Sequence, residues 1–216
     1  MLFVLHVAAL TALLWGSLLH TEEAEGADFQ RTSLSYLAGD GYVSGEHQRN
    51  IISFDAIKSG RAGLVYANVD LQSFTGNKAN NVSRIVGHLG QGFHLAGQLQ
   101  NSTGYSNTNI GVGYDWFGAN GFAGIDVYRR SDSLMGDGSY VFLFGRVMFT
   151  SGISLDGFID ISVPDSGQQQ WLAQPSIMYH FDKSFSVGIE QQLYLNKGYV
   201  NGLDESVPQL KLTYGW

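Results

Sequence analysis

The stretch "ISLDGFIDIS", residues 153–162, alternates between apolar and polar side chains except at Gly157 and Phe158. The apolar parity holds Ile153, Leu155, Ile159 and Ile161, and the polar parity holds Ser154, Asp156, Asp160 and Ser162. A period of two is that of a β-strand, whose successive side chains point to opposite faces. Most such strands belong to soluble antiparallel sheets with the apolar face in the core. The stretch alone therefore leaves open which face is buried.

The same alternation continues through the chain from Thr32 onward, in about twelve segments. Their spans are 32–39, 48–57, 61–73, 82–90, 93–100, 107–116, 121–130, 138–149, 153–162, 169–181, 185–195 and 207–216. Most are about ten residues long, which is the length a tilted strand needs to cross a bilayer. Nothing between them has the length or period of a crossover helix, so we expect neighbouring strands to be antiparallel.

The connections between these segments alternate between long and short. Short connections such as "KSG", "QG" and "TSG" alternate with longer ones such as "DGYVSGEH" and "NKGYVNGLDES". A soluble sandwich has no reason for this alternation, whereas a transmembrane barrel has short periplasmic turns and longer external loops. The sequence therefore predicts an all-β fold, a transmembrane antiparallel up-and-down β-barrel of about twelve strands in the outer membrane. An even number of strands places both of its ends on the periplasmic side.

Composition agrees with an exported membrane protein. Charged residues make up 14% of the chain, against about 25% in ordinary soluble domains. The chain has no cysteine, which excludes disulfides and thiol chemistry. Its net charge of −7 argues against nucleic acid as a partner.

The first residues differ from the rest of the chain. Residues 2–19 are almost wholly apolar, and the polar stretch "HTEEAEG" follows them. This pattern is typical of a secretory signal-peptide helix with a cleavage site after Gly26. We therefore expect a signal peptide at residues 1–26 and the barrel at 27–216. A retained membrane-anchor helix is the alternative.

In a barrel the apolar parity faces lipid and the polar parity faces the lumen. Asp156 and Asp160 of the first stretch should therefore point inward. The inward candidates are Asp55, Asp70, Asp115, Asp126, Asp156, Asp160 and Glu190, with Arg84, Arg146 and His88 as basic counterparts. Such a wall could line a solute channel, or its ion pairs could fill and stiffen a narrow barrel.

The segment 138–149, "GSYVFLFGRVMF", is apolar on both parities. Arg146 facing lipid would cost about 2–4 kcal/mol at mid-depth, so its parity should face inward. That places Tyr140, Phe142 and Phe144 in the lumen, and Phe158 on the next strand shares the inward parity. Aromatic faces in a polar lumen can stack on flat solutes such as bases. The alternative is that these rings only fill a small barrel.

Enzyme signals are weak. The sequence contains no GxSxG, HExxH or P-loop motif. Its glycine-rich stretches are not followed by helical patterns, as a nucleotide cradle would require. We expect no enzymatic activity, no cofactor and no metal.

Several stretches resemble a known family. In the C-terminal third "LDGFIDI", "AQPSIMYHF", "SVGIEQQLYLNKGY" and "DESVPQLKLTYGW" resemble, in order and spacing, strands of the Tsx-like nucleoside-specific channels of Gram-negative outer membranes. "NIGVGYDW" and "SLSYLAGDGY" resemble the middle and the start of that family. The chain is shorter than the family, and it ends in Trp216 where outer-membrane strands usually end in Phe.

The resemblance implies a monomeric passive channel for nucleosides or similar small polar solutes. Its expected partners are outer-membrane lipids, the solutes, and the assembly machinery that recognises the C-terminal strand. The resemblance assigns lumen aromatic and polar residues to base and sugar. On this chain the candidates are Tyr140, Phe142, Phe144, Arg146, Asp156, Phe158, Asp160, Asp126 and Glu190. The alternative is a plugged structural barrel or surface receptor without significant transport.

Overall fold

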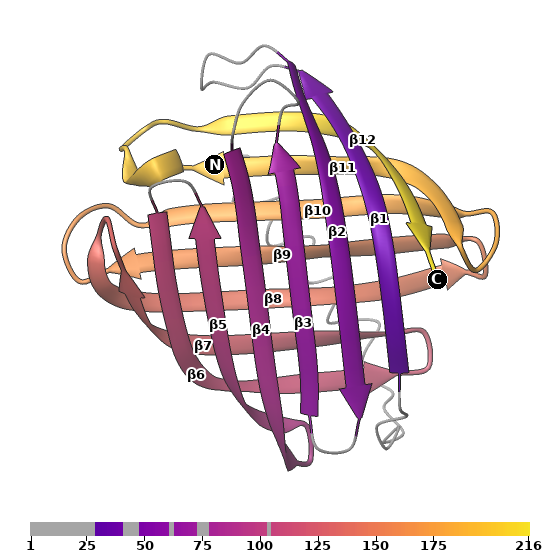
Figure 1. The fold of residues 1–216 in the computed structure, drawn as a ribbon, viewed down its shortest axis with the longest axis horizontal. Helices are drawn as coiled ribbons and strands as arrows, with labels where there is room; N and C mark the ends of the chain where they lie inside the picture. Colours follow the sequence, from indigo (N-terminus) through magenta and orange to yellow (C-terminus); the bar gives the residue numbers. More distant parts are fainter. Residues whose placement is uncertain (1–28, 41–47, 61–62, 73–77, 103–104) are drawn as a thin grey trace.

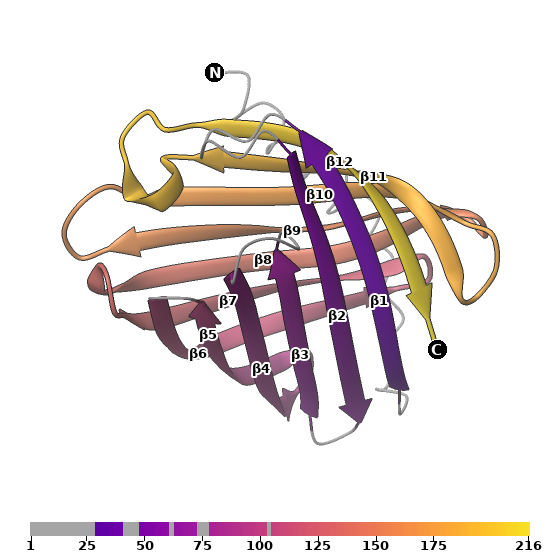
Figure 2. The same cartoon turned by 45° about the horizontal axis from the view of Figure 1, so that its top comes forward.

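The computed structural model describes five stretches of the chain as a closed antiparallel barrel of twelve strands (Figures 1 and 2). The described residues are 29–40, 48–60, 63–72, 78–102 and 105–216. The predicted signal peptide, residues 1–26, lies outside them. The predicted all-β fold is confirmed.

Each predicted segment corresponds to one strand, and most strands are longer than predicted. Their bounds are β1 Phe29–Asp40, β2 Gln48–Gly60, β3 Gly63–Gln72, β4 Lys78–Gly90, β5 Phe93–Ser102, β6 Tyr105–Gly118, β7 Gly121–Asp132, β8 Gly136–Thr150, β9 Ile153–Pro164, β10 Gln170–His180, β11 Phe185–Leu195 and β12 Glu205–Gly215. The extra residues continue the hydrogen-bonded ladders beyond the apolar part of the strands. Ladder bonds need no apolar side chains, so the alternating pattern underestimates strand length.

The barrel closes between its first and last strands. Ser33 pairs with Gly215 in the β1–β12 ladder. Beyond it the Thr32 N–H donates to the Trp216 carbonyl at 3.0 Å, and the Trp216 N–H donates to the Thr32 carbonyl at 2.9 Å. Both views show β1 beside β12, with the near strands crossing the far ones (Figures 1 and 2). That crossing is expected of tilted strands on opposite walls of a barrel.

The two ends of the barrel differ. We call the end with the connections 165–169 and 196–204 the loop end, and the end with 91–92, 119–120 and 151–152 the turn end. The alternation of long and short connections is weaker than predicted. At the loop end β7 and β8 are joined by residues 133–135 alone, because both strands extend into the predicted loop.

Apolar side chains cover much of the exterior. Ile177, Ile189 and Leu210 form a cross-strand row on β10, β11 and β12, and they are 62%, 61% and 50% exposed. So large an apolar surface cannot face water, which means that the barrel fits a bilayer. Nearer the turn end, Phe93 and Tyr114 meet edge to face at 4.7 Å, as in an aromatic girdle.

The stretch 153–162 lies in β9 with its polar parity inward. Asp156 contacts Arg146 inside the barrel. The apolar parity faces outward, although Leu155 and Ile159 are only 7% and 4% exposed. These two therefore differ from the exposed row on β10–β12, and the prediction that the whole apolar parity meets lipid holds only in part.

The short elements at the two ends are stabilised by local hydrogen bonds. The loop between β11 and β12 contains one 3-10 turn, η1, at Lys197–Tyr199. In the turn after β10, Asp182 accepts bonds from the N–H groups of Phe185 and Ser184, both at 2.7 Å. These bonds favour the carboxylate and lower the pKa of Asp182.

Among the described residues, no helix is long and apolar enough to cross a membrane.

Candidate functional site

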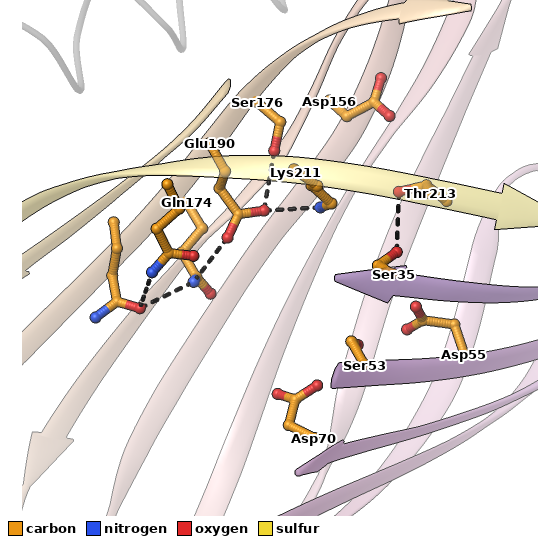
Figure 3. A network of polar contacts seen from close by, with 12 residues as sticks. Ser35, Ser53, Asp55, Asp70, Asp156, Gln174, Ser176, Glu190, Lys211 and Thr213 are labelled. Atoms are coloured by element: carbon orange, nitrogen blue, oxygen red, sulfur yellow. Dashed lines mark hydrogen bonds and ion pairs between the residues drawn. The ribbon is translucent and has the colours of Figure 1, made fainter. Parts of the chain in front are cut away.

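The interior face of the barrel carries the candidate site. Figure 3 shows side chains of β9–β12 facing those of β1–β3, with Ser35 on β1 bonded to Thr213 on β12 at 2.9 Å. On the β2–β3 wall, the Tyr66 hydroxyl donates to Asp55 at 2.7 Å and the Asn68 amide donates to Asp70 at 3.1 Å. The interior is therefore polar and already extensively hydrogen-bonded.

A continuous chain of polar contacts, the polar ladder, runs along β10–β12 and reaches η1. Its members are Lys211, Glu190, Ser176, Gln174, Gln192, Gln209, Glu205 and Lys197. Lys211 Nζ donates to Glu190 Oε2 at 2.7 Å toward the turn end (Figure 3). Lys197 Nζ lies 2.7 Å from both oxygens of Glu205 at the loop end. The ladder thus offers hydrogen-bonding groups along much of one wall.

A second, more buried cluster joins β4, β5, β6 and β7. Arg84 Nη2 lies 2.7 Å from Asp126 Oδ2, and His94 Nε2 lies 2.7 Å from Asp126 Oδ1. His94 Nδ1 lies 3.2 Å from Asp115 Oδ2. Asp126 is fully buried. A Cβ at Gly113 would collide with His94 and Asp126, so this glycine allows the cluster to lie against the backbone.

An aromatic row faces inward from β8 and β9. The rings of Tyr140 and Phe142 stack at 6.4 Å, and those of Phe142 and Phe144 stack at 5.3 Å. Phe158 lies 5.6 Å from Phe142 across the ladder. Tyr140 is buried, whereas the three Phe rings are partly exposed. The Arg84 guanidinium lies 4.8 Å from the centre of the Phe144 ring, which connects the row to the buried cluster.

All nine predicted site residues are on the interior face. The aromatic row contains Tyr140, Phe142, Phe144 and Phe158. Arg146 Nη2 donates to Asp156 Oδ2 at 2.5 Å near the turn end of the same wall. Asp160 pairs with Phe142 in the β8–β9 ladder. Asp126 and Glu190 belong instead to the buried cluster and to the polar ladder, so the nine residues form no single site.

Sequence reasoning missed several interior residues. They are His94, Tyr128, Arg130, Asp132 and Glu205. The signal was present for some of them: His94 shares its parity with Gln98, and Tyr128 and Arg130 share that of Asp126. Within the described part of the chain, no group of three His, Cys, Asp or Glu side chains could hold a metal.

The chain matches no protein-family model and no curated protein sequence. Solved structures do match it. The KdgM porin aligns with a TM-score of 0.58 at 10% identity, over 85% of this chain and 98% of KdgM. KdgM in complex with disordered oligogalacturonate gives 0.57 and the same identity and coverage. The NanC porin gives 0.58 at 13% identity, over 83% of this chain and 97% of NanC.

These likenesses define the class of the fold. It is the twelve-stranded β-barrel of outer-membrane porins, and the apolar exterior agrees with the predicted location in the outer membrane. At such low identity the comparison shows the fold alone. The resemblance to the Tsx-like nucleoside-specific channels stays a prediction.

Proposed function

We propose that the protein is a passive outer-membrane channel for small polar solutes, and that nucleosides are the preferred class. The observation that carries this proposal is the aromatic row, whose partly exposed Phe rings lie in a largely polar interior. A nucleoside combines a flat base, which can stack on Phe142 or Phe144, with hydroxyl groups. Those hydroxyls would find acceptors in Asp160 and in the polar ladder.

The interior charges favour neutral or cationic solutes. Among the described interior side chains, carboxylates outnumber arginine and lysine side chains. The carboxylates are Asp55, Asp70, Asp115, Asp126, Asp132, Asp156, Asp160, Glu190 and Glu205, and the arginine and lysine side chains are Arg31, Arg84, Arg130, Arg146, Lys197 and Lys211, with His88, His94 and His180 also on the interior face. The oligogalacturonate in the KdgM complex is itself acidic. A carboxylate-rich wall would repel it, so we propose a different solute class for this chain.

A second candidate is a plugged barrel that serves as a structural protein or surface receptor. Val86, Ala96, Tyr128 and Tyr140 form a buried apolar cluster inside the barrel, and Phe142 packs against it. Together with the Arg84–Asp126 pair, this cluster fills part of the lumen. The two candidates differ in whether solutes pass.

Solute flux tests the proposal. The purified protein would be refolded into lipid vesicles, and the uptake of uridine and arabinose would be measured against vesicles without protein. The channel proposal expects uptake of uridine to exceed that of arabinose. Uptake of neither solute would overturn it and favour the plugged barrel. Equal uptake would support a channel but remove the preference for nucleosides.

A further inference from the structure

The loop end of the barrel contains a cavity of about 270 Å³ that is separate from the Phe rings of the aromatic row. Its walls include Arg130, Tyr140, Asp160, Ser162, Tyr194 and Tyr199. These residues come from β7, β8, β9, β11 and η1, so only the closed barrel brings them together. Drug-sized ligands occupy pockets of about 300–1,000 Å³. The volume therefore suits a compound with one or two rings.

Arg130 is held rigidly on one side of this cavity. Its Nη2 donates to Asp132 Oδ2 at 2.6 Å, and its Nη1 donates to the Ser162 hydroxyl. The guanidinium carbon lies 5.4 Å from the centre of the Tyr140 ring and 6.0 Å from that of Tyr199. Asp132 offsets the charge of Arg130, so the guanidinium and the two rings together form a flat surface with little net charge.

The two connections that border the cavity, residues 133–135 and the one that contains η1, are also held by hydrogen bonds and ion pairs. Asp132 Oδ1 accepts from the N–H groups of Leu134 and Met135, at 2.8 and 3.1 Å. Lys197 of η1 is bonded to Glu205 and lies 5.0 Å from the centre of the Tyr194 ring. The walls are thus fixed before any ligand binds, which lowers the entropic cost of binding.

Asp160 gives the cavity its chemical preference. Its carboxylate is partly exposed and can accept hydrogen bonds from a ligand. Two adjacent hydroxyl groups match the two oxygens of a carboxyl group, each of which can accept hydrogen bonds. Asp160 disfavours an anionic ligand, and the positive charge of Arg130 is already offset by Asp132, so a neutral ligand meets no opposing charge. A neutral ring can lie flat against Tyr199 while its hydroxyls reach Asp160.

From this arrangement we infer that the cavity is a binding site for a neutral ring compound with adjacent hydroxyl groups. Asp160 accepts from the hydroxyls, and Tyr199 packs against the ring. The ribose of a nucleoside and a free monosaccharide both have this chemistry. The site does not require the barrel to conduct, because a plugged barrel would still contain it.

Calorimetry on the purified full-length protein in detergent micelles tests the site. Uridine, its 2′,3′-dideoxy analogue and methyl riboside would be titrated into wild type, Asp160→Asn, Tyr199→Ala and Asp165→Asn. We expect uridine to bind wild type and Asp165→Asn equally, since Asp165 lies outside the cavity. Asp160→Asn and Tyr199→Ala should each weaken binding about tenfold, a change of about 1.4 kcal/mol. The dideoxy analogue should bind the wild type as weakly as uridine binds Asp160→Asn.

Two results would overturn the inference: no binding of uridine or methyl riboside to wild type at millimolar concentration, or equal binding by wild type and both cavity variants. Tyr199 lies outside the strands, so its variant tests the site even if Asp160→Asn fails to fold. Equal affinity for uridine and methyl riboside would assign the site to the sugar ring, and tighter binding of uridine would assign it to the whole nucleoside. Vesicle uptake by the same protein reports on the channel separately.

Discussion

Arg84 on β4 and Asp126 on β7 form an ion pair of 2.7 Å across strands that are not neighbours in the barrel. Their side chains are 7% and 0% exposed. Tyr128 and His94 complete the hydrogen bonding of the carboxylate, at 2.6 and 2.7 Å. The pair therefore holds together a third of the barrel from the inside, and neither partner can be removed without leaving a buried charge.

Loss of this pair should destabilise the barrel. Asp126→Ala leaves Arg84 charged and buried, and we expect the free energy of unfolding to fall by about 3–5 kcal/mol. Urea unfolding in lipid vesicles measures the change. The matched control is Asp165→Ala, which removes an exposed, solvent-screened ion pair with Arg129 and should cost far less. Equal effects of the two substitutions would contradict the proposed role of the buried cluster.

The exposed apolar row on β10–β12 should meet lipid. Ile189→Arg places a charge on this surface, and we expect folding into bilayers to be less favourable by about 2–4 kcal/mol if the site is near mid-depth. Ile189→Leu keeps the surface apolar and is the control. The fraction folded in vesicles, read from the mobility shift of unheated samples on gels, gives the answer. An arginine tolerated at position 189 would mean that this face does not contact hydrocarbon.

Orientation in the membrane can be tested because the chain contains no cysteine. Asn201→Cys in the loop after β11 should be labelled on whole cells by a membrane-impermeant thiol reagent. Lys183→Cys in the turn after β10 should be labelled only after the cells are opened. Both side chains are exposed, so accessibility to solvent is matched. If only Lys183→Cys were labelled on whole cells, the turn end and not the loop end would face the outside of the cell.

The aromatic row should contribute directly to nucleoside passage. Phe144→Ala removes one partly exposed ring, and we expect nucleoside binding to weaken by about 1–3 kcal/mol, the usual worth of a base–aromatic stack. Arabinose has no flat aromatic face, so its flux should change much less. Phe144 also packs against Arg84, so Phe144→Leu is the control for lost volume. Equal changes for uridine and arabinose would show that the ring only shapes the pore.

Much of the fold could be predicted from the alternation of apolar and polar side chains. Strands β8 and β9 show why: in β9 a period of two assigns Asp156 and Asp160 to one face, and in β8 the cost of Arg146 in lipid decides that Tyr140 and Phe142 face inward. Loop lengths were less informative. The extension of β7 and β8 depends on backbone hydrogen bonds, which any side chain permits, and the low exposure of Leu155 and Ile159 has no counterpart in the pattern.

The candidate sites divide in the same way. The sequence by itself determined which side chains of a strand share a face, because the direction of a side chain follows from the local backbone. Only the closed barrel decided which of these side chains meet: Arg84 with Asp126, and Arg130 with the ring of Tyr199. Such contacts depend on the circumference of the barrel, on the stagger of its strands and on the reach of each side chain. None of these is a local property, so no single stretch of the sequence predicts which side chains meet.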